Sequence, residues 1–318
     1  MDNSLTIVLD DPHVLKEVCG VHDENLQVIE KILGIPVYTR GNELIINSND
    51  PVKRDLFGEI INQIKTYREK GRLPEPEMVE TICRTLIEGD LDKNTVFRDL
   101  HITIPSSPKV FPRTCNQSAY IDGMYTYDVV FGIGPAGTGK TYLAVAHALK
   151  EVLERKKKKL VLTRPVVEAG ESLGFLPGDL TQKLNPYLRP LYDAMDSLIP
   201  ATIINRLEEN RIIEIAPLAY MRGRSLRDSY IILDEAQNTT KEQMKMFLTR
   251  IGEGSKAIVT GDITQIDLPN NSNSGLIHAM NILKDIPEIC FTFFTSKDVV
   301  RNPLVRKIVN AYEKETNS

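Results

Sequence analysis

Eight consecutive residues have the spacing of a phosphate-binding loop. They read Gly134-Pro135-Ala136-Gly137-Thr138-Gly139-Lys140-Thr141, which fits the pattern G-x-x-x-x-G-K-[ST] at every position. Glycines let backbone N–H groups face phosphate oxygens, the Lys140 side chain reaches the β- and γ-phosphates, and the Thr141 hydroxyl can bind Mg²⁺. The loop therefore predicts a nucleoside triphosphate site, and a glycine-rich turn with a solvated lysine is the plain structural alternative.

An acidic pair follows another apolar run of the chain. Asp234 and Glu235 come directly after residues 231–233, a run of Ile and Leu. We expect Asp234 to help hold Mg²⁺ and Glu235 to polarise the attacking water, so the pair favours hydrolysis over transfer of phosphate to an acceptor. A strand that ends in Asp-Glu is also a common helix cap, and this is the alternative interpretation.

A third polar segment follows the apolar run before Thr260. It contains Asp262 and Gln265, and we expect it at the carboxyl edge of the sheet, where ligands of doubly wound sheets bind. Gln265 would sense the γ-phosphate by hydrogen bonding and couple its loss to motion. The structural alternative is an Asx turn built by Asp262.

The elements that position these residues alternate along the chain. Apolar, β-rich runs predict strands at residues 128–133, 160–163, 212–215, 230–233, 257–260 and 290–294. Helical patterns lie at 142–153, 179–198, 241–250, 274–283 and 304–312. Strands separated by helices predict an α/β domain with a doubly wound parallel sheet over residues 111–318.

The leading part of the chain is expected to fold separately. Residues 1–70 contain a helical pattern at 25–33, two strands at 36–38 and 43–46, and a closing helix at 52–67, which together predict a small α+β module. Residues 71–110 carry several prolines around one short helical pattern, so we interpret them as a connector without a core.

Composition narrows the class of protein. The 318 residues carry 39 basic and 43 acidic side chains, and the formal charge of -4 argues against a chain coated in nucleic acid. The four cysteines show neither disulfide nor zinc-site spacing. We find no run of eighteen apolar residues and no basic leader, so we expect a soluble, cytoplasmic protein that does not act at a membrane.

Several ordered blocks of sequence resemble the PhoH-like ATPase family. The resemblance covers about residues 116–312, and its blocks are residues 134–144, 162–165, 168–171, 174–179, 219–224, 232–240, 260–265 and 296–301. That family looks like a single motor core of superfamily 1 helicases, a RecA/helicase-like P-loop NTPase fold. The resemblance implies ATP as the nucleotide, RNA metabolism as the setting, RNA as a partner and an endoribonuclease as a further partner.

The resemblance also implies roles for two side chains outside the motifs above. Gln117 matches the glutamine that reads adenine in such motors, while an exposed helix residue is the alternative. Arg164 lies in a segment that corresponds to a helicase strand-contact motif, where it would face nucleic acid or the nucleotide. Its alternative is a salt bridge to Glu168 or Glu171.

The leading segment resembles the KH-like module of the same family. Residues 19–26 stand at the place of the nucleic-acid clamp loop, which in the G-x-x-G form brings backbone close to four nucleotides. Gly20 matches, but Asp23 stands where the second glycine belongs and Glu24 follows it. RNA binding and protein contact both remain open for this module.

A single motor core has no second domain to donate an arginine to the transferred phosphate. Such an arginine is worth about 10³–10⁵ in rate, so hydrolysis is slow or a neighbouring subunit supplies the group. Arg222, Arg224 and Arg301 are the candidates, each also suited to a surface ion pair. We expect a ring-forming homo-oligomer that binds or remodels RNA; an ATP-switched protein adaptor and a phosphotransferase are the competing functions.

Overall fold

The computed structural model describes residues 3–69, 73–88, 101–165, 180–268 and 274–300. The chain divides into two compact units: residues 1–101 with 111–118, and residues 102–110 with 119–318. The division differs from the expected one, because residues 111–118 belong with the N-terminal unit and residues 102–110 with the second.

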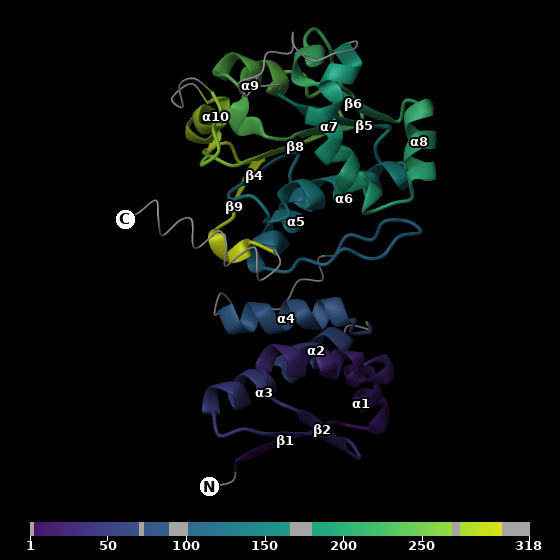
Figure 1. Ribbon diagram of the computed structural model, residues 1–318, viewed down its shortest axis with the longest axis vertical. Helices are drawn as coiled ribbons and strands as arrows, with labels where there is room; N and C mark the ends of the chain where they lie inside the picture. The colour runs from purple at the N-terminus through teal and green to yellow at the C-terminus, as the bar shows by residue number, and fades with distance from the viewer. Residues whose placement is uncertain (1–2, 70–72, 89–100, 166–179, 269–273, 301–318) are drawn as a thin grey trace. The chain divides into compact units, whose positions relative to one another are not determined.

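The N-terminal unit contains a small antiparallel sheet. Its strands are β1 (Ser4–Val8), β2 (Val37–Arg40) and β3 (Glu43–Asn47), and β3 lies between the other two. Leu44 and Ile46 on the central strand are fully buried, and Figure 1 shows helices on one side of the sheet. The predicted α+β module is present, with strand β1 added at a position where we expected none.

The described residues of this unit also contain four complete helices and a short 3₁₀ turn. They are α1 (Pro12–Cys19), η1 (Val21–Asp23), α2 (Glu24–Leu33), α3 (Pro51–Glu69) and α4 (Pro76–Glu88). Helix α1 was not predicted, although Asp11 accepts hydrogen bonds from the N–H groups of His13 and Val14 and Pro12 opens the helix. An N-cap aspartate followed by proline is a local signal that marks such a start.

Helix α4 corrects the interpretation of residues 71–110 as a connector without a core. Met78, Val79 and Ile82 are buried in the hydrophobic core of the N-terminal unit. The Thr81 hydroxyl donates to the carbonyl oxygen of Pro112, at 2.5 Å. The prolines of this segment flank the helix, where they are tolerated, and do not interrupt it.

The second unit is built on a six-stranded parallel sheet. Its strands are β4 (Val129–Ile133), β5 (Lys159–Arg164), β6 (Ile213–Pro217), β7 (Ser229–Leu233), β8 (Lys256–Gly261) and β9 (Ile289–Phe293). Their order is β6-β5-β7-β8-β4-β9, and every neighbouring pair is parallel. Every residue of β7 and β8 is buried, as expected for central strands covered on both faces. The predicted α/β fold class is confirmed.

Helices cover both faces of this sheet. They are α5 (Cys115–Thr126), which begins in the N-terminal unit, α6 (Lys140–Leu153), α7 (Leu180–Asp196), α8 (Ala201–Glu209), α9 (Lys241–Leu248) and α10 (Gly275–Leu283). Figure 1 shows α9 and α10 on one side of the strands and α5 and α6 on the other. Phe247 of α9 and Leu276 of α10 share a core with Val259 of β8, while His147 of α6 bonds the Tyr230 hydroxyl on β7.

The remaining short elements that the structure describes are 3₁₀ turns. They are η3 (Leu218–Met221), η4 (Ala236–Asn238) and η6 (Ser296–Asp298). Within the described ranges, no helix is long and apolar enough to cross a membrane. The helix that we expected at residues 304–312 lies outside the residues that the structure describes.

The strand order determines where a ligand site forms. Strands β5, β7, β8 and β4 are consecutive neighbours, and the register pairs Thr163 with Leu233, Leu233 with Val259 and Ile133 with Gly261. The segments that follow these strands therefore leave the same edge of the sheet side by side. This edge is where open parallel sheets bind their ligands.

Candidate active site

The phosphate-binding loop, residues 134–141, connects β4 to α6. Gly134 has a φ angle of 148°, and Gly139, which precedes the first turn of α6, has a φ angle of 80°. A side chain at Gly134 would place its Cβ 2.4 Å from the carbonyl oxygen of Phe294, so only glycine fits there. The Gly134 N–H donates to the Gly261 carbonyl at 3.0 Å, which ties the loop to the end of β8.

Lys140 is buried, and its ammonium group bonds atoms of its own loop. Nζ donates to the carbonyl oxygens of Gly134 at 2.6 Å and Pro135 at 2.7 Å, and to Thr138 Oγ1 at 3.3 Å. These contacts hold the charged group at the centre of the loop. A phosphate that binds the loop N–H groups would therefore meet a fixed positive charge.

Thr141 and Asp234, the two predicted metal ligands, lie in direct contact. Thr141 Oγ1 donates to Asp234 Oδ1 at 2.7 Å, although 93 positions separate the residues in the chain. Thr260 Oγ1 donates to the same carboxylate oxygen at 2.6 Å. Asp234 is only 5% exposed, so its orientation is fixed by these hydroxyl groups and by packing. Hard oxygen ligands of this kind suit Mg²⁺.

Glu235 follows Asp234 in an unusual backbone conformation. Its φ angle of 53° lies in the left-handed region, where a non-glycine residue is held only by its surroundings. Two donors bind its carboxylate: Arg164 Nη2 lies 2.8 Å from Oε1, and Gln237 Nε2 lies 2.6 Å from Oε2. The backbone turn and the two donors together direct the Glu235 side chain.

Arg164 has partners at the site that the sequence analysis does not name. Its Nε also lies 3.5 Å from Asp234 Oδ2, and its Nη1 donates to the carbonyl oxygen of Tyr187 at 2.8 Å. The guanidinium therefore pairs with both carboxylates of the site and offsets part of their negative charge. The partners of the alternative interpretation, Glu168 and Glu171, lie outside the described residues.

The segment after β8 contains both a turn and a pocket residue. Asp262 Oδ1 accepts from the Thr264 N–H at 2.9 Å and from Thr264 Oγ1 at 2.6 Å, so the Asx turn is present. Asp262 Oδ2 accepts from the Ala136 N–H of the phosphate loop at 3.1 Å. Gln265 is exposed and lines the pocket. The turn and a sensor role for Gln265 are thus compatible, and the sensor role stays a prediction.

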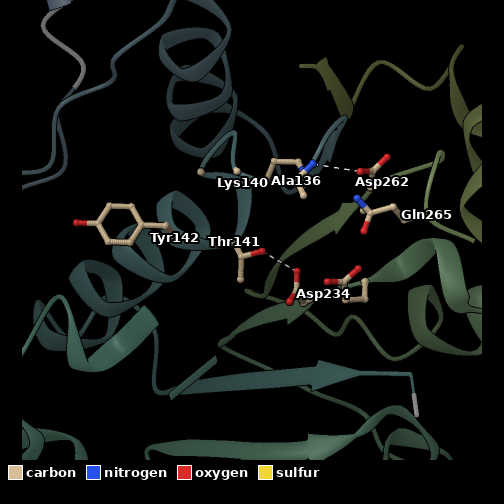
Figure 2. Close-up of a pocket in the computed structure, with 11 residues that line it drawn as sticks. Ala136, Lys140, Thr141, Tyr142, Asp234, Asp262 and Gln265 are labelled. Atoms are coloured by element: carbon tan, nitrogen blue, oxygen red, sulfur yellow. Dashed lines mark hydrogen bonds between the residues drawn. The ribbon is translucent and has the colours of Figure 1, made fainter. Parts of the chain in front are cut away.

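These groups surround one cavity of about 260 Å³. Figure 2 shows Thr141 and Asp234 directed toward each other and Asp262 directed toward Ala136, whereas Tyr142 extends away from them. The cavity is lined by Ala136, Gly137, Gly139, Lys140, Thr141, Tyr142, Asp234, Glu235, Gly261, Asp262 and Gln265. The loop, the acidic pair and Gln265 come together as the motifs predict.

Sequence reasoning missed the polar contacts that join these motifs. It assigned no role to Gln237 and none to Asp262 beyond the turn, yet both are at least 95% buried and bond neighbouring motifs. A signal was available, because a glutamine beside an acidic pair in an apolar context must find partners. The identity of those partners depends on the tertiary fold.

Gln117 is not the exposed residue of the alternative interpretation. It is 4% exposed, and its Oε1 accepts from the Arg113 N–H at 2.6 Å near the start of α5. Gln117 falls within the N-terminal unit. Its predicted role in reading adenine stays a prediction.

The three candidate arginines have different surroundings. Arg224 donates to both oxygens of Glu214, at 2.5 Å and 2.9 Å, which is the ion pair of the alternative interpretation. This Arg224 contact and a hydrogen bond from Lys159 lower the pKa of Glu214 to about 2. Arg222 is exposed at the end of η3, and Arg301 lies outside the described residues.

The clamp-like loop of the N-terminal unit, residues 19–26, has left-handed backbone angles that favour glycine, although the second glycine of the motif is absent. Asp23, at the position of that glycine, has φ 60° and ψ 24°, and His22 is also left-handed at φ 53°. A cavity of about 590 Å³ lies beside Gly20 and the buried Asn25, whose Nδ2 donates to the carbonyl oxygens of Val18 and Pro74. Its lining includes Lys16 and three glutamates, so charge does not favour a phosphate there.

Comparison with known proteins agrees with the motifs. The family model described as PhoH-like protein matches residues 109–313. The PhoH-like protein of Mycobacterium tuberculosis (strain ATCC 25618 / H37Rv) is 46% identical over 301 residues, which cover 95% of this chain and 85% of that protein. The PhoH-like protein of Bacillus subtilis (strain 168) is 45% identical over 318 residues, covering 96% of each chain.

A more distant relative is also similar. Protein PhoH of Escherichia coli (strain K12) is 36% identical over 250 residues, covering 78% of this chain and 70% of that protein. The match to the family model spans the parallel sheet, the phosphate loop and the acidic pair described above. The resemblance stated from the motifs is therefore confirmed, and the chain belongs to the PhoH family.

Proposed function

We propose that this chain is a Mg²⁺-dependent ATPase whose hydrolysis is coupled to the binding or remodelling of RNA. One observation carries the ATPase part: the phosphate loop, the Thr141–Asp234 pair and the Glu235 carboxylate border the same cavity. Phosphate binding, metal binding and activation of water thus each have a candidate group at one site. Family membership supports the same assignment.

The side chains present fit a magnesium ion. Thr141 and Asp234 would hold it, because a hydroxyl and a carboxylate that already touch at 2.7 Å form a set of hard oxygen ligands. The Thr260 hydroxyl also donates to this carboxylate and helps to fix its orientation. When bound, Mg²⁺ neutralises negative charge on the β- and γ-phosphates.

Side chains and backbone groups of the chain would bind the phosphates and activate water. The loop N–H groups and Lys140 would bind and orient the phosphates, and Gln265, which lines the cavity, would bond the γ-phosphate. Glu235 orients the attacking water and accepts its proton. Each Glu235 oxygen bonds one protein donor, and a carboxylate oxygen has a further lone pair with which to accept from water.

The RNA part of the proposal is supported by the family resemblance. Members of this family resemble helicase motors of RNA metabolism, so we propose RNA as the substrate and an endoribonuclease as a partner. The four cysteines are free thiols, which suits a reducing, cytoplasmic setting.

We also propose a ring of identical subunits in which one subunit completes the site of the next. Within the described residues one phosphate loop lies at one parallel sheet, and a neighbouring subunit would supply the arginine that acts on the transferred phosphate. Among the candidates within the described residues, Arg222 is exposed and Arg224 is held by Glu214. We therefore favour Arg222 as the arginine donated between subunits.

A second candidate function is an ATP-switched adaptor for another protein. It is favoured by the clamp-like loop, where Asp23 and Glu24 replace the glycine and basic neighbours that nucleic acid requires. In this case the nucleotide state would control docking of a protein partner. RNA would then have no effect on hydrolysis.

The deciding experiment measures release of free phosphate with single- and double-stranded RNAs at two salt concentrations. A remodeller shows RNA-stimulated hydrolysis and RNA binding that weakens steeply with salt. An adaptor hydrolyses ATP without an RNA response and captures a protein only with nucleotide. Transfer of phosphate to an added acceptor without free phosphate would instead identify a phosphotransferase.

The matched variants are Lys140→Ala and Lys150→Ala. Both lysines lie on α6 and are at most 9% exposed, but Lys150 pairs with Glu154 on the same helix and is absent from the cavity lining. We expect Lys140→Ala to abolish turnover and Lys150→Ala to retain it. Undiminished hydrolysis in a pure Lys140→Ala preparation would contradict the assignment of the site.

A further inference from the structure

Gln237 joins the acidic pair to the phosphate loop without lining the cavity. Gln237 is 1% exposed and does not line the cavity, whereas its partners Glu235 and Asp262 do. Nε2 donates to Glu235 Oε2 at 2.6 Å, and Oε1 accepts from the Asp262 N–H at 3.0 Å. Both ends of this amide are therefore used by groups of the candidate active site.

The chemistry of the neighbours determines which way the amide points. The Asp262 N–H is a donor only, so it must face the amide oxygen. An ionised Glu235 carboxylate is an acceptor only, so it must face the amide nitrogen. In a reversed amide, the NH₂ group would face the Asp262 N–H and the oxygen would face the Glu235 carboxylate. Neither pair can form a hydrogen bond, and burial makes such unsatisfied groups costly.

The backbone around Gln237 is anchored as well. The Ser274 hydroxyl donates to the Gln237 carbonyl oxygen at 2.9 Å. A Cβ on Gly261 would lie 2.9 Å from Gln237 Oε1, so the glycine at the end of β8 leaves the space that the amide occupies. The side chain thus has little freedom to adopt another position.

A continuous set of hydrogen bonds follows from these contacts. It runs from the Glu235 carboxylate through Gln237 to the Asp262 N–H, and from the Asp262 carboxylate to the Ala136 N–H at 3.1 Å. Ala136 belongs to the phosphate loop. The group that would activate water is thus linked to the loop that would hold the phosphates.

We propose that Gln237 is a positioning residue for hydrolysis, which fixes the Glu235 carboxylate relative to the phosphate loop without touching the substrate. The inference rests on the proposed ATPase function. Because Gln237 lies outside the cavity lining, its loss alters the geometry of water activation and leaves nucleotide binding in place. Misplacing a catalytic group by about 1 Å costs roughly 10²-fold in rate.

The experiment compares Gln237→Leu and Gln237→Glu in the full chain with a matched control, Asn238→Leu. Asn238 is the next buried amide of η4, and it also bonds a neighbour at both ends: its Nδ2 and Oδ1 bind Asp267 at 3.0 Å and 2.8 Å. Asp267 is not part of the cavity lining. Asn238→Leu thus reproduces the loss of a buried amide without affecting Glu235.

We expect Gln237→Leu to lower kcat by about 10- to 100-fold. KM and the Kd for ATP, measured by equilibrium titration, should stay within about threefold of wild type. Gln237→Glu keeps the shape and the acceptor for the Asp262 N–H but sets a carboxylate against Glu235, so kcat should fall at least as far. Asn238→Leu should have near wild-type kcat with a similar change in Tm.

A double-mutant cycle with Glu235→Gln distinguishes a loss of kcat that acts through Glu235 from a loss caused by general disruption of the fold. If Gln237 acts through Glu235, adding Gln237→Leu to Glu235→Gln should cause almost no further loss of kcat. An equal loss in both backgrounds, or an equal loss in Asn238→Leu, would overturn the inference.

Amide hydrogen exchange on the protein without nucleotide gives a readout that is independent of turnover. Exchange at the Asp262 N–H should accelerate in Gln237→Leu, stay slow in Gln237→Glu and stay slow in Asn238→Leu. Unchanged protection in Gln237→Leu would contradict the observed link. Hydrolysis that depends on Lys140 but not on Gln237 would overturn this inference alone, whereas hydrolysis that does not require Lys140 would overturn the proposed function as well.

Discussion

Arg164 binds Glu235, the residue that would activate water, at a distance of 2.8 Å between Nη2 and Oε1. The same guanidinium lies 3.5 Å from Asp234, so one arginine at the end of β5 pairs with both carboxylates that follow β7. The Arg164 and Asp234 side chains are 15% and 7% exposed, which makes the pair largely shielded from water. The single positive charge of Arg164 offsets part of the negative charge that the two carboxylates present to the phosphates.

Replacing Arg164 with alanine should weaken ATP binding and also lower the free energy of unfolding. The unpaired carboxylates would repel phosphates, so we expect KM for ATP to rise by about tenfold. The free energy of unfolding should fall by about 1–3 kcal/mol, the cost of leaving a buried charged group without its partner. Kinetics and denaturant unfolding measure the two effects.

Magnesium provides the specific test for Arg164→Ala. Mg²⁺ held by Asp234 would replace the lost positive charge, so added Mg²⁺ should restore more stability to the variant than to wild type. The control is Arg189→Ala, because Arg189 forms an exposed pair with Asp193 on α7 and such pairs contribute little. A stability deficit that does not respond to Mg²⁺ would rule out this account of Arg164.

Asp262→Asn should strengthen ATP binding. The Asp262 carboxylate accepts the Ala136 N–H of the phosphate loop, where it competes with a phosphate oxygen and repels it. Asparagine keeps an oxygen for the turn with Thr264 and leaves the backbone N–H that bonds Gln237. Removing one negative charge should lower the Kd by about fivefold, equivalent to roughly 1 kcal/mol.

Equilibrium titration with ATP and Mg²⁺ measures the Asp262 effect. Asp267→Asn is the matched control, since Asp267 lies on the same segment, bonds Asn238 and does not line the cavity. It should leave the Kd unchanged. Weaker binding by Asp262→Asn would mean that the carboxylate supports the phosphate site instead of competing with it.

Changing Arg222 and Arg224 to alanine, one at a time, should have different effects on kcat and on Tm. Arg222 is exposed, so Arg222→Ala should leave Tm unchanged and lower kcat by about 10³-fold or more if the residue acts between subunits. Arg224→Ala should instead lower Tm, because Glu214 loses a bidentate partner. Mass in solution with and without ATP gives the state of assembly.

Mixing of subunits tests the arginine more directly. Lys140→Ala subunits have an intact Arg222, and Arg222→Ala subunits have an intact phosphate loop. Mixed rings should therefore hydrolyse ATP although neither variant does so alone. An inactive mixture, or full activity of a monomer, would exclude donation between subunits.

The fold of the second unit could be predicted because its signals are local. Central strands of a parallel sheet are buried on both faces, so residues such as Ile231 and Val259 fall in continuous apolar runs. The phosphate loop is also local, since glycines and Lys140 occur within eight positions. Residues 71–110 show a short helical pattern among their prolines, but the place of helix α4 in a core was not predicted, because prolines also flank connectors.

The contacts that complete the site could not be predicted in the same way. Arg164 and Glu235 are 71 positions apart, and Gln237 and Asp262 are 25 apart, so their pairing depends on strand order. The left-handed turn at Glu235 has no glycine to indicate it. Buried polar groups must find partners, but the sequence does not say which partners lie within reach.

Acid should destabilise the protein through His147 before it acts on the carboxylates. His147 is 1% exposed, and its Nδ1 bonds the Tyr230 hydroxyl at 2.8 Å. Burial, followed by the nearby positive charges of Lys256 and Lys150, lowers the pKa of His147 from 6.5 to about 3. The unfolded chain therefore binds a proton below pH 6.5 that the folded chain excludes, and stability falls as pH falls from 6.5 toward 3.

Protonation of Glu214 also lowers the stability of the protein as pH falls, but in a lower pH range. Its folded pKa of about 2 lies below the ordinary value of 4.5, so the stability it contributes is lost between pH 4.5 and 2. Between pH 6.5 and 4.5 the His147 effect should dominate and remove roughly 2 kcal/mol. His147→Phe should flatten the pH dependence of unfolding in that range, whereas His13→Gln, a change at an exposed histidine, should retain it. An unchanged slope in His147→Phe would assign the acid sensitivity to other groups.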